Sequence, residues 1–522
     1  MRVASIIFLA ALACLPFQNS AAVRPGTAAH GPPGGSDTAL LDLVPGSALV
    51  AVDITGLAGR WREVRAVGPV ARIQDAVSDW AGFDSGLLPG LAGDCAVVFL
   101  APAGRMPSIM PVAILRPCDP EASYRLFTSA GGLSRQYAYD ALWLAPSGEE
   151  DQLDRLIRDE RTRLSEALPK GEMEANLPPG GLLRGWLNPV ACRRFLLDFS
   201  RGSGLPAPLR AAAAVAAAEL DAVRYAAFRR DLEGGQLVAD GIVAYDPSRL
   251  PPQVAFVLDP GAARVAQPQH YPAGTVMSVV FRPEGRAWLP WLHYLAGSDP
   301  SGPFRNLGFW LDEFQARYRR DLERDLFGAL GDRGLVFVMA GDRDAPEFAA
   351  ALELREPAAV EATLLDVLSW IGEQTWLGTF GLVVPRSRHQ VQGGLTVHAL
   401  DFWTPLGRRH ALSLAVADGQ LLIATRPEIL HRIRGWVLET SAGRLPSNHE
   451  NAAHGSVRYV GPEAPRVLGS LLPADHGTPV GRFVATIAGA VAGLEGLCID
   501  MHYGRDAICF RGSVRFRADA SR

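Results

Sequence analysis

The sequence predicts an α+β fold made of two tandem pseudo-repeats, with largely antiparallel sheets packed against helices. The chain has 522 residues, which is too long for one small core and suggests two to four domains. Short strand-like runs follow one another or alternate with helical patterns, as in antiparallel sheets. Landmarks also recur in the same order in both halves, which indicates one plan used twice: residues 45–52 and 272–279, 91–99 and 330–337, 183–189 and 457–462, and 241–245 and 512–516.

Residues 1–22 are predicted to be an export signal. Arg2 gives a short positive region, residues 6–13 are apolar, and Ser20-Ala21-Ala22 offers the small residues that signal peptidase requires. The alternative is lipidation of Cys14, which ends a loose version of the bacterial lipobox. We therefore expect an exported protein that is periplasmic or extracellular. If Cys14 is lipidated, we expect the protein to be anchored to the membrane as a lipoprotein.

The first repeat is predicted at residues 41–250, after a flexible leader at 23–40 that is rich in Gly, Pro and Ala. A Pro/Gly turn precedes its first strand, and a Gly-Asp turn at 93–94 precedes a buried apolar strand. Its main elements are a strand at 48–52, a helical pattern at 70–80, a strand at 112–115, a helix at 119–127, a strand at 141–145, an Ala-rich helix at 209–223 and a hairpin at 223–245.

The second repeat is predicted at residues 270–518, after a Pro-rich linker at 251–269. It follows the order of the first, with a strand at 276–281 and an amphipathic helix that carries an aromatic stripe over 309–318. It also carries an insertion near 379–410. A doubly wound parallel sheet is the alternative fold, but no Gly-rich phosphate loop follows either first strand.

Two pairs of cysteines are predicted to form disulfides in an oxidising compartment, namely Cys498 with Cys509 and Cys95 with Cys118. A two-residue turn at 503–504 would place the first pair on directly opposed residues. The second pair lies on two successive apolar runs. Each bond would contribute about 2–4 kcal/mol of stability. Cys192 is predicted to be a buried free thiol.

The sequence argues against nucleic-acid binding and against a transmembrane helix. The formal net charge of −4 argues against a basic nucleic-acid footprint. The best candidate for a membrane span, residues 483–494, has about twelve apolar residues and runs into Glu495, which is too short for a transmembrane helix. We therefore expect no nucleic-acid partner and no transmembrane helix in the mature chain.

The search for catalytic motifs assigns no catalytic, cofactor-binding or metal-binding residue. His449 and His454 are five apart, whereas a zinc-binding helix needs histidines four apart. No serine lies in the Gly-x-Ser-x-Gly pattern of a nucleophile elbow. Function is therefore expected in the insertion, where Arg386, Arg388 and His389 form a candidate interaction loop. His389 would face His398 if the insertion folds as a hairpin.

Short motifs at the matched landmarks are similar to those of exported bacterial proteins grouped under a domain of unknown function, an uncharacterised family. These are a Pro-x-x-(Thr/Ala)-x-x-x-Val strand, a Leu-Gly-Asp turn before an apolar strand, and an acidic-Pro helix start. The resemblance implies no activity, cofactor or site residue. The motifs lie at residues 45–52, Gly93-Asp94, Leu330-Gly331-Asp332, Asp119-Pro120 and Glu356-Pro357, and the similarity would cover 42–518.

The sequence favours a non-catalytic exported envelope or secreted protein that acts as a binding or structural module for an unspecified protein or envelope component, without cofactors. The alternatives are a secreted hydrolase whose site lacks a known motif, and an envelope protein that binds lipid or assists assembly. A deep tryptophan-lined groove would favour binding. Its candidate lining is Trp288, Trp291, Trp310, Trp370 and Trp376.

Overall fold

The computed structural model describes twenty-two stretches of the chain, and all structural statements concern these residues. They are 40–53, 95–103, 108–116, 133–146, 148–158, 163–169, 172–173, 176–177, 181–201, 207–233, 236–250, 265, 268, 270–283, 285–298, 306–341, 346–373, 383–403, 409–442, 455–459, 494–504 and 506–516.

The first half of the chain forms an antiparallel sheet whose strands pair in the spatial order β4–β5–β3–β2–β1–β6–β7–β8. Helices lie in the connections between strands. The elements are η1 (Leu40–Leu43), β1 (Val50–Asp53), β2 (Cys95–Ala103), β3 (Ser108–Arg116), β4 (Leu133–Ala138), β5 (Ala141–Pro146), α6 (Glu150–Arg158), α7 (Leu164–Ala167), β6 (Leu183–Leu187), α9 (Pro189–Arg201), α10 (Ala207–Leu220), β7 (Val223–Glu233) and β8 (Gln236–Tyr245).

The second half pairs its strands in the order β12–β13–β14–β15–β11–β10–β9–β16–β17–β18, again antiparallel. Its elements are β9 (Thr275–Phe281), η3 (Gly285–Ala287), α12 (Trp288–Ser298), α13 (Leu307–Tyr318), η4 (Glu323–Phe327), β10 (Leu330–Ala340), β11 (Pro346–Leu354), α14 (Pro357–Glu373), β12 (Val383–Gln392), β13 (Leu395–Trp403), β14 (Arg409–Ala417), β15 (Gln420–Ala424), α15 (Pro427–Ala442), β16 (Gly455–Tyr459), β17 (Leu494–Tyr503) and β18 (Ala507–Phe516).

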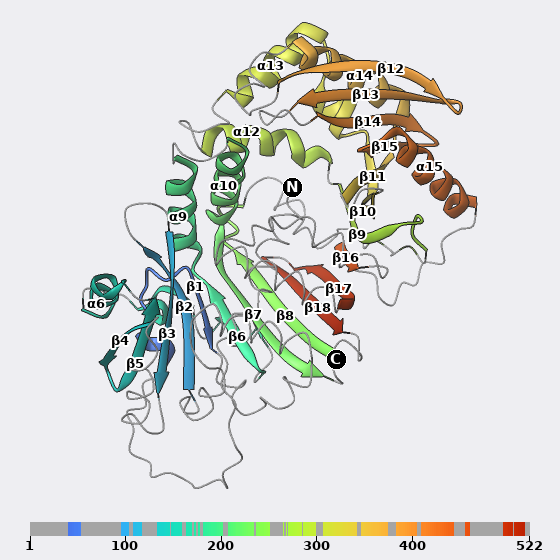
Figure 1. The fold of residues 1–522 in the computed structure, drawn as a ribbon. Helices are drawn as coiled ribbons and strands as arrows, with labels where there is room; N and C mark the ends of the chain where they lie inside the picture. The colour runs from blue at the N-terminus through green and yellow to red at the C-terminus, as the bar shows by residue number, and fades with distance from the viewer. Residues whose placement is uncertain are drawn as a thin grey trace.

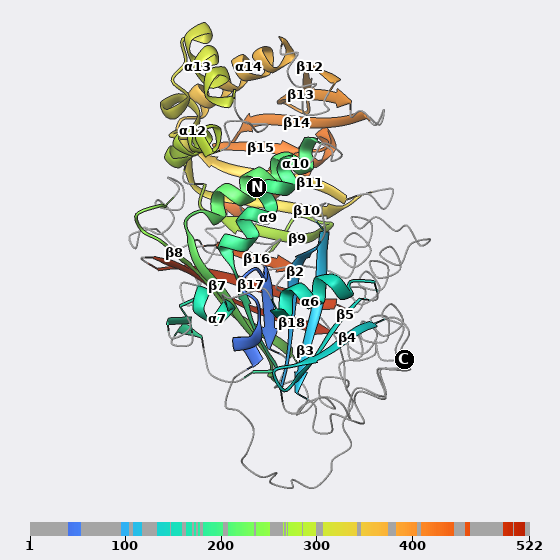
Figure 2. The same cartoon turned by 90° about the vertical axis from the view of Figure 1, so that its left-hand side faces the viewer.

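Strands β8 and β18 join the two halves into one 18-stranded sheet (Figure 1). Their antiparallel register runs from Ala507 opposite Ala244 to Val514 opposite Leu237. Gly241 is needed at this seam, because a Cβ there would lie 1.9 Å from the Phe510 ring. Figure 2 shows β12 at the top and β4 in the lower half of the view, and these two are the outermost of the described strands.

The strand pairings within the two halves follow the same order. Seven pairings of the first half each have a counterpart at the same place in the second, with β1 corresponding to β9, β5 to β15 and β8 to β18. The second half adds the hairpin β12–β13 between α14 and β14. The predicted α+β class with a largely antiparallel sheet is confirmed.

Helices pack on both faces of the second half's sheet, and their apolar side chains make the core. Ile429, Leu430 and Ile433 of α15 pack against Phe337 of β10, while α14 packs on the opposite face through residues such as Val360. In the first half, α6 packs onto β2, β3 and β5 in the same way. Each fully buried Leu, Ile or Phe contributes roughly 1.5–3 kcal/mol, so these clusters hold the sheet together.

The tryptophans whose joint lining of a deep groove would have favoured a binding role lie mainly in the core. Trp291 of α12 is buried against Val215 and Ala218 of α10, whose small side chains let the two helices approach closely. Trp370 is buried against Phe314 of α13. Trp288 and Trp310 are partly buried against these clusters, and Trp376 lies outside the described residues. The helical spacing of the aromatic residues therefore reflects burial.

Several predicted elements fall outside the described residues and remain predictions. These are the export signal and leader at 1–39, the helices at 70–80 and 119–127, and the histidine pair at 449–454. Of the predicted linker, residues 251–269, only Val265 and Pro268 are described.

Candidate functional site: an arginine-lined groove beside β7

A groove of about 540 Å³ lies where α9 passes the end of α10 and the start of β7. Its walls come from three separate parts of the first half. Five arginines and three aspartates line it together with five apolar residues. The lining residues are Val190, Arg193, Arg194, Leu197, Asp198, Arg201, Leu220, Asp221, Ala222, Val223, Arg224, Asp246 and Arg249.

Helix α9 is fixed against the start of the first half by its N-cap. The backbone N–H of Ala191 donates to Oδ1 of Asn188 at 3.2 Å, and Nδ2 of Asn188 donates to the carbonyl of Gly46 at 2.6 Å. Pro189 occupies the first helical position, where its missing N–H costs nothing. The thiol of Cys192 donates to the carbonyl of Leu49 at 3.3 Å. These contacts direct one side of α9 toward β1 and leave another to line the groove.

Three of the five arginines are paired with carboxylates. Arg193 lies 3.0 Å from Asp221, Arg249 lies 3.7 Å from Asp246, and Arg224 contacts Glu172. These pairs are partly exposed, so each contributes at most about 1 kcal/mol of stability. They balance charge around the groove, and the Arg193–Asp221 pair joins α9 to the segment that follows α10.

Arg194 and Arg201 are both exposed, and within the described residues neither has a carboxylate partner. They lie seven positions apart on α9, so both fall on one helix face, about 10 Å apart along the axis. Asp198 lies between them on the same face. The wall formed by α9 therefore carries an excess of positive charge.

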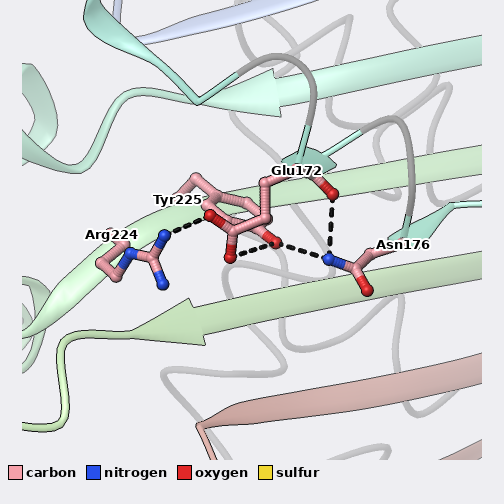
Figure 3. Close-up of polar contacts among 4 residues, drawn as sticks. All are labelled: Glu172, Asn176, Arg224 and Tyr225. Carbon is pink, nitrogen blue, oxygen red and sulfur yellow. Dashed lines mark hydrogen bonds and ion pairs between the residues drawn. The ribbon is translucent and has the colours of Figure 1, made fainter.

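The opposite wall is stiffened by a cluster around Tyr225, shown in Figure 3. Nδ2 of Asn176 donates to the Tyr225 hydroxyl at 3.1 Å and to the backbone carbonyl of Glu172 at 2.9 Å. The same hydroxyl donates to Oε1 of Glu172 at 3.5 Å, and Arg224 donates to the other carboxylate oxygen. Burial raises the pKa of Tyr225, so its hydroxyl stays protonated and can hold Glu172 in place. The carboxylate of Glu172 in turn fixes the position of the Arg224 guanidinium group.

The lining suits the binding of an anion that has an apolar portion. Guanidinium groups bind carboxylates and phosphates with paired hydrogen bonds. Val190, 72% exposed, and Leu197 supply apolar surface beside them. The described part of the lining contains no His, Ser, Thr, Cys or Lys, and its three aspartates are the groups that could act as general bases. The described lining therefore offers anion-binding guanidinium groups beside apolar surface.

The predicted insertion folds as a hairpin that belongs to the sheet. Gly393 and Gly394, both with positive φ, turn the chain between β12 and β13. The backbone of His389 lies directly opposite His398, as predicted for a hairpin, and His398 is only 3% exposed. Arg386, Arg388 and His389 lie on β12, but their side chains are outside the described part of the chain.

The opposed placement predicted for Cys498 and Cys509 is wrong. Both are free thiols, because Cys498 lies opposite Ser513 and Cys509 lies opposite His502. The chain turns two residues later than predicted, where Gly504 N–H donates to the carbonyl of Ala507 at 2.7 Å. The two cysteines are consequently about 13 Å apart along the strands.

The other cysteines with a predicted role are Cys192, Cys95, Cys118 and Cys14. Cys192 is a free thiol, and burial raises its pKa to about 12. Cys95 begins β2, with its side chain outside the described part, and Cys118 and Cys14 also lie outside it. Neither the Cys95–Cys118 bond nor lipidation of Cys14 is therefore tested.

Two features concern metals and membranes. Among the described residues, no three His, Cys, Asp or Glu side chains are grouped so that they could hold a metal ion. The described helices include none that is long and apolar enough to cross a membrane. Asp332, which the sequence predicted in a Gly-Asp turn, lies instead within strand β10, where it pairs with Arg355 at 2.9 Å and Arg282 at 3.2 Å, while Asp94 lies outside the described residues.

Comparison with known proteins adds little to this geometry. No protein-family model and no curated protein sequence matches the chain. A solved structure described as "Structure of crystal form I of TP0453" matches over 44% of this chain and 88% of that chain, with 10% sequence identity and a TM-score of 0.22. A similarity of this size establishes neither a shared fold nor a shared function.

Proposed function

We propose that this protein is a non-catalytic, exported binding protein of the cell envelope, and that the arginine-lined groove binds an anionic partner. One observation carries the proposal: a groove of about 540 Å³ exposes Arg194 and Arg201, which have no carboxylate partner among the described residues. The neighbouring apolar side chains favour a partner that combines negative charge with apolar surface, such as an acidic polypeptide or another envelope component.

We also propose that the protein arose by duplication of one α+β unit. The shared order of seven strand pairings supports this, and so does the register. Phe99 lies opposite Ala51 and Phe337 lies opposite Ser278, at positions that match between the repeated sequence landmarks. In addition, the β4–β5 and β14–β15 hairpins each turn through two residues with positive φ, namely Tyr139-Asp140 and Asp418-Gly419.

Charge reversal on α9 tests the binding role. The probe is a fluorescently labelled polyglutamate peptide at low salt, with inorganic phosphate as a competitor. The double substitution Arg194→Glu and Arg201→Glu should weaken peptide binding at least tenfold, because charge-assisted hydrogen bonds contribute about 1.5–3 kcal/mol each. As a matched control, Arg155→Glu with Arg286→Glu changes the charge equally at exposed sites outside the groove. Equal losses in both variants, or none in the first, would contradict the proposal.

Export is tested on protein isolated from its native cell. N-terminal sequencing should find a chain that begins near Val23, or mass spectrometry should find lipid on Cys14. A cytoplasmic chain that retains Met1 would rule out both forms of export.

A further inference from the structure

The groove-facing side of α9 repeats an apolar and a basic side chain at the same interval. Val190 and Leu197 are seven positions apart, and so are Arg194 and Arg201. At about 100° per residue, these four residues fall within roughly 60° of one another around the helix axis. Val190 and both arginines are exposed. The α9 wall of the arginine-lined groove therefore presents two apolar–basic units, about 10 Å apart along the axis.

An acidic side chain separates the two arginines. Asp198 is exposed on the same side of α9, and in the described part of the chain no ion pair joins it to Arg194 or Arg201. The other two aspartates of the lining are paired with arginines. The unpaired charges of this wall thus run basic, acidic, basic, and a complementary partner carries an acidic, a basic and an acidic group in line.

The interval of the repeat favours a helical ligand. Every seventh residue of an α-helix returns to nearly the same face about 10 Å further along, which matches the spacing on α9. One face of an extended strand instead repeats about every 6.8 Å. A lipid headgroup concentrates its charge at one point and offers no such repeat. A helix that lies along α9 therefore fits the wall better than a strand or a headgroup does.

We propose that the groove takes an acidic amphipathic helix of a partner protein, packed lengthwise against α9. The inference rests on the proposed function of the groove and names its partner. Apolar side chains seven residues apart on the docking helix cover Val190 and Leu197. Two flanking acidic side chains pair with Arg194 and Arg201, and a basic side chain between them meets Asp198. An apolar seam with flanking charge pairs is how paired helices gain affinity and fix their register.

The described helices of the chain itself are not free to play this part. The apolar side chains of α6, α14 and α15 are buried in the core, so none of these three helices can offer an apolar seam to the groove of a second copy. The docking helix is therefore assigned to another protein.

Fluorescence anisotropy with a lactam-stapled helical peptide and the full chain tests the partner. The peptide has about twenty residues, with two leucines seven apart, a glutamate beside each leucine on the same face, and a lysine between the glutamates. It should bind roughly tenfold more tightly than a stapled peptide of the same composition whose leucines and glutamates are five apart, because that spacing places them on different faces. Equal affinities would overturn the inference.

The apolar contact is tested at an exposed valine. Val190→Gln removes apolar surface without changing the charge, and it should weaken binding of the stapled peptide roughly tenfold. Val391→Gln is the matched control, because Val391 on β12 is equally exposed, at 72%, and does not line the groove. This control should bind as the wild type does. An equal loss in both variants, or no loss in Val190→Gln, contradicts the proposed packing.

Exchange of charges between α9 and the peptide tests the register. Arg201→Glu should weaken binding roughly tenfold, and replacing one glutamate of the peptide with lysine should restore it. The other glutamate should be the one whose replacement rescues Arg194→Glu. Rescue by both replacements alike, or by neither, contradicts a helix docked in one register.

Other occupants give different results in the same assays. Vesicles of phosphatidylcholine and phosphatidylglycerol that bind more tightly than the peptide, and lose binding when Arg194 and Arg201 are both changed to glutamate, would assign the groove to a lipid headgroup. Self-association that this double variant abolishes would assign it to a second copy of the chain. If polyglutamate binds but the ordered peptide has no advantage, this inference alone fails. If polyglutamate also fails to bind, the proposed function fails with it.

Discussion

The two halves of the molecule differ most clearly at one strand. In the second half the outer edge of β14 is covered by the hairpin β12–β13, whereas in the first half β4 has β5 as its strand partner in the described sheet. Their sequences differ as well, because Leu412 and Leu414 of β14 pack in the cluster with α14, while β4 carries Arg135 and exposed Tyr137. A covered edge can be apolar, but an open edge must resist indiscriminate pairing. The composition of an edge strand thus follows from what lies beside it.

The largest effect on stability is expected from deleting the β12–β13 hairpin, which removes this difference between the halves. Replacing residues 383–403 with a short Gly-Ser linker should unfold the second half, because the hairpin buries Leu395, Val397 and His398. The loss of these side chains and the exposure of β14 should cost at least about 5 kcal/mol, close to the whole stability of a domain. Differential scanning calorimetry should show one transition lost. Unchanged melting of the deletion variant would contradict this expectation.

Matched core phenylalanines sharpen the comparison. Phe99 packs edge to face on Trp143 and Phe337 packs in the same manner on Trp436, with ring centroids 6.2 and 5.4 Å apart. Both phenylalanines are fully buried, so Phe99→Ala and Phe337→Ala should each cost about 3–5 kcal/mol. Urea unfolding of the two variants measures these costs. A large loss in one half only would show that the corresponding strands do not carry equivalent cores.

The two hairpin turns provide a smaller and opposite pair of effects. Asp140 and Gly419 both occupy the second turn position with positive φ. Asp140→Gly should stabilise the protein by about 1 kcal/mol, whereas Gly419→Ala should destabilise it by about 1–2 kcal/mol, since only glycine adopts this conformation without strain. A Cβ at Gly419 meets no atom within 4 Å, so its effect isolates the backbone. Thermal melting of both variants should show shifts of opposite sign.

Local patterns in the sequence predicted much of this architecture. Alternating apolar residues located the strand at 141–145 and the hairpin at 223–245, since both depend on residues close in sequence. The closing turn of the second half was misplaced because Tyr503-Gly504 resembles a hairpin turn, while the chain pairs Tyr503 with Ile508. Sheet register depends on long-range pairing, and a two-residue displacement of the turn moves every opposed pair.

The groove could not be predicted from the sequence, because its walls come from segments that are far apart in the chain. Arg194 and Arg201 share a helical face, a pattern that is visible in the sequence but typical of any solvated helix. The other walls come from residues 220–224 and 246–249, and only the folded chain brings them beside α9. The spacing of the tryptophans is the same whether they line a groove or fill a core, so the sequence alone could not decide between the two.

The smallest effect compares two thiols, one in each half. Burial raises the pKa of Cys192 to about 12 and that of Cys498 to about 11, from an ordinary value near 9. Between pH 9 and the folded-state pKa, the unfolded chain releases a proton that the folded chain retains, so stability falls as pH rises through this window and is unaffected below it.

Replacing Cys192 with alanine should therefore flatten the decline in unfolding free energy above pH 9, and more so than Cys498→Ala does. Urea unfolding at several pH values between 8 and 10.5 measures the difference between each variant and the wild type, which cancels the titration of other groups. Cys192 should also react with iodoacetamide more slowly than the exposed Cys509. Identical pH slopes in the wild type and Cys192→Ala would mean that burial does not raise the pKa of this thiol in the folded chain.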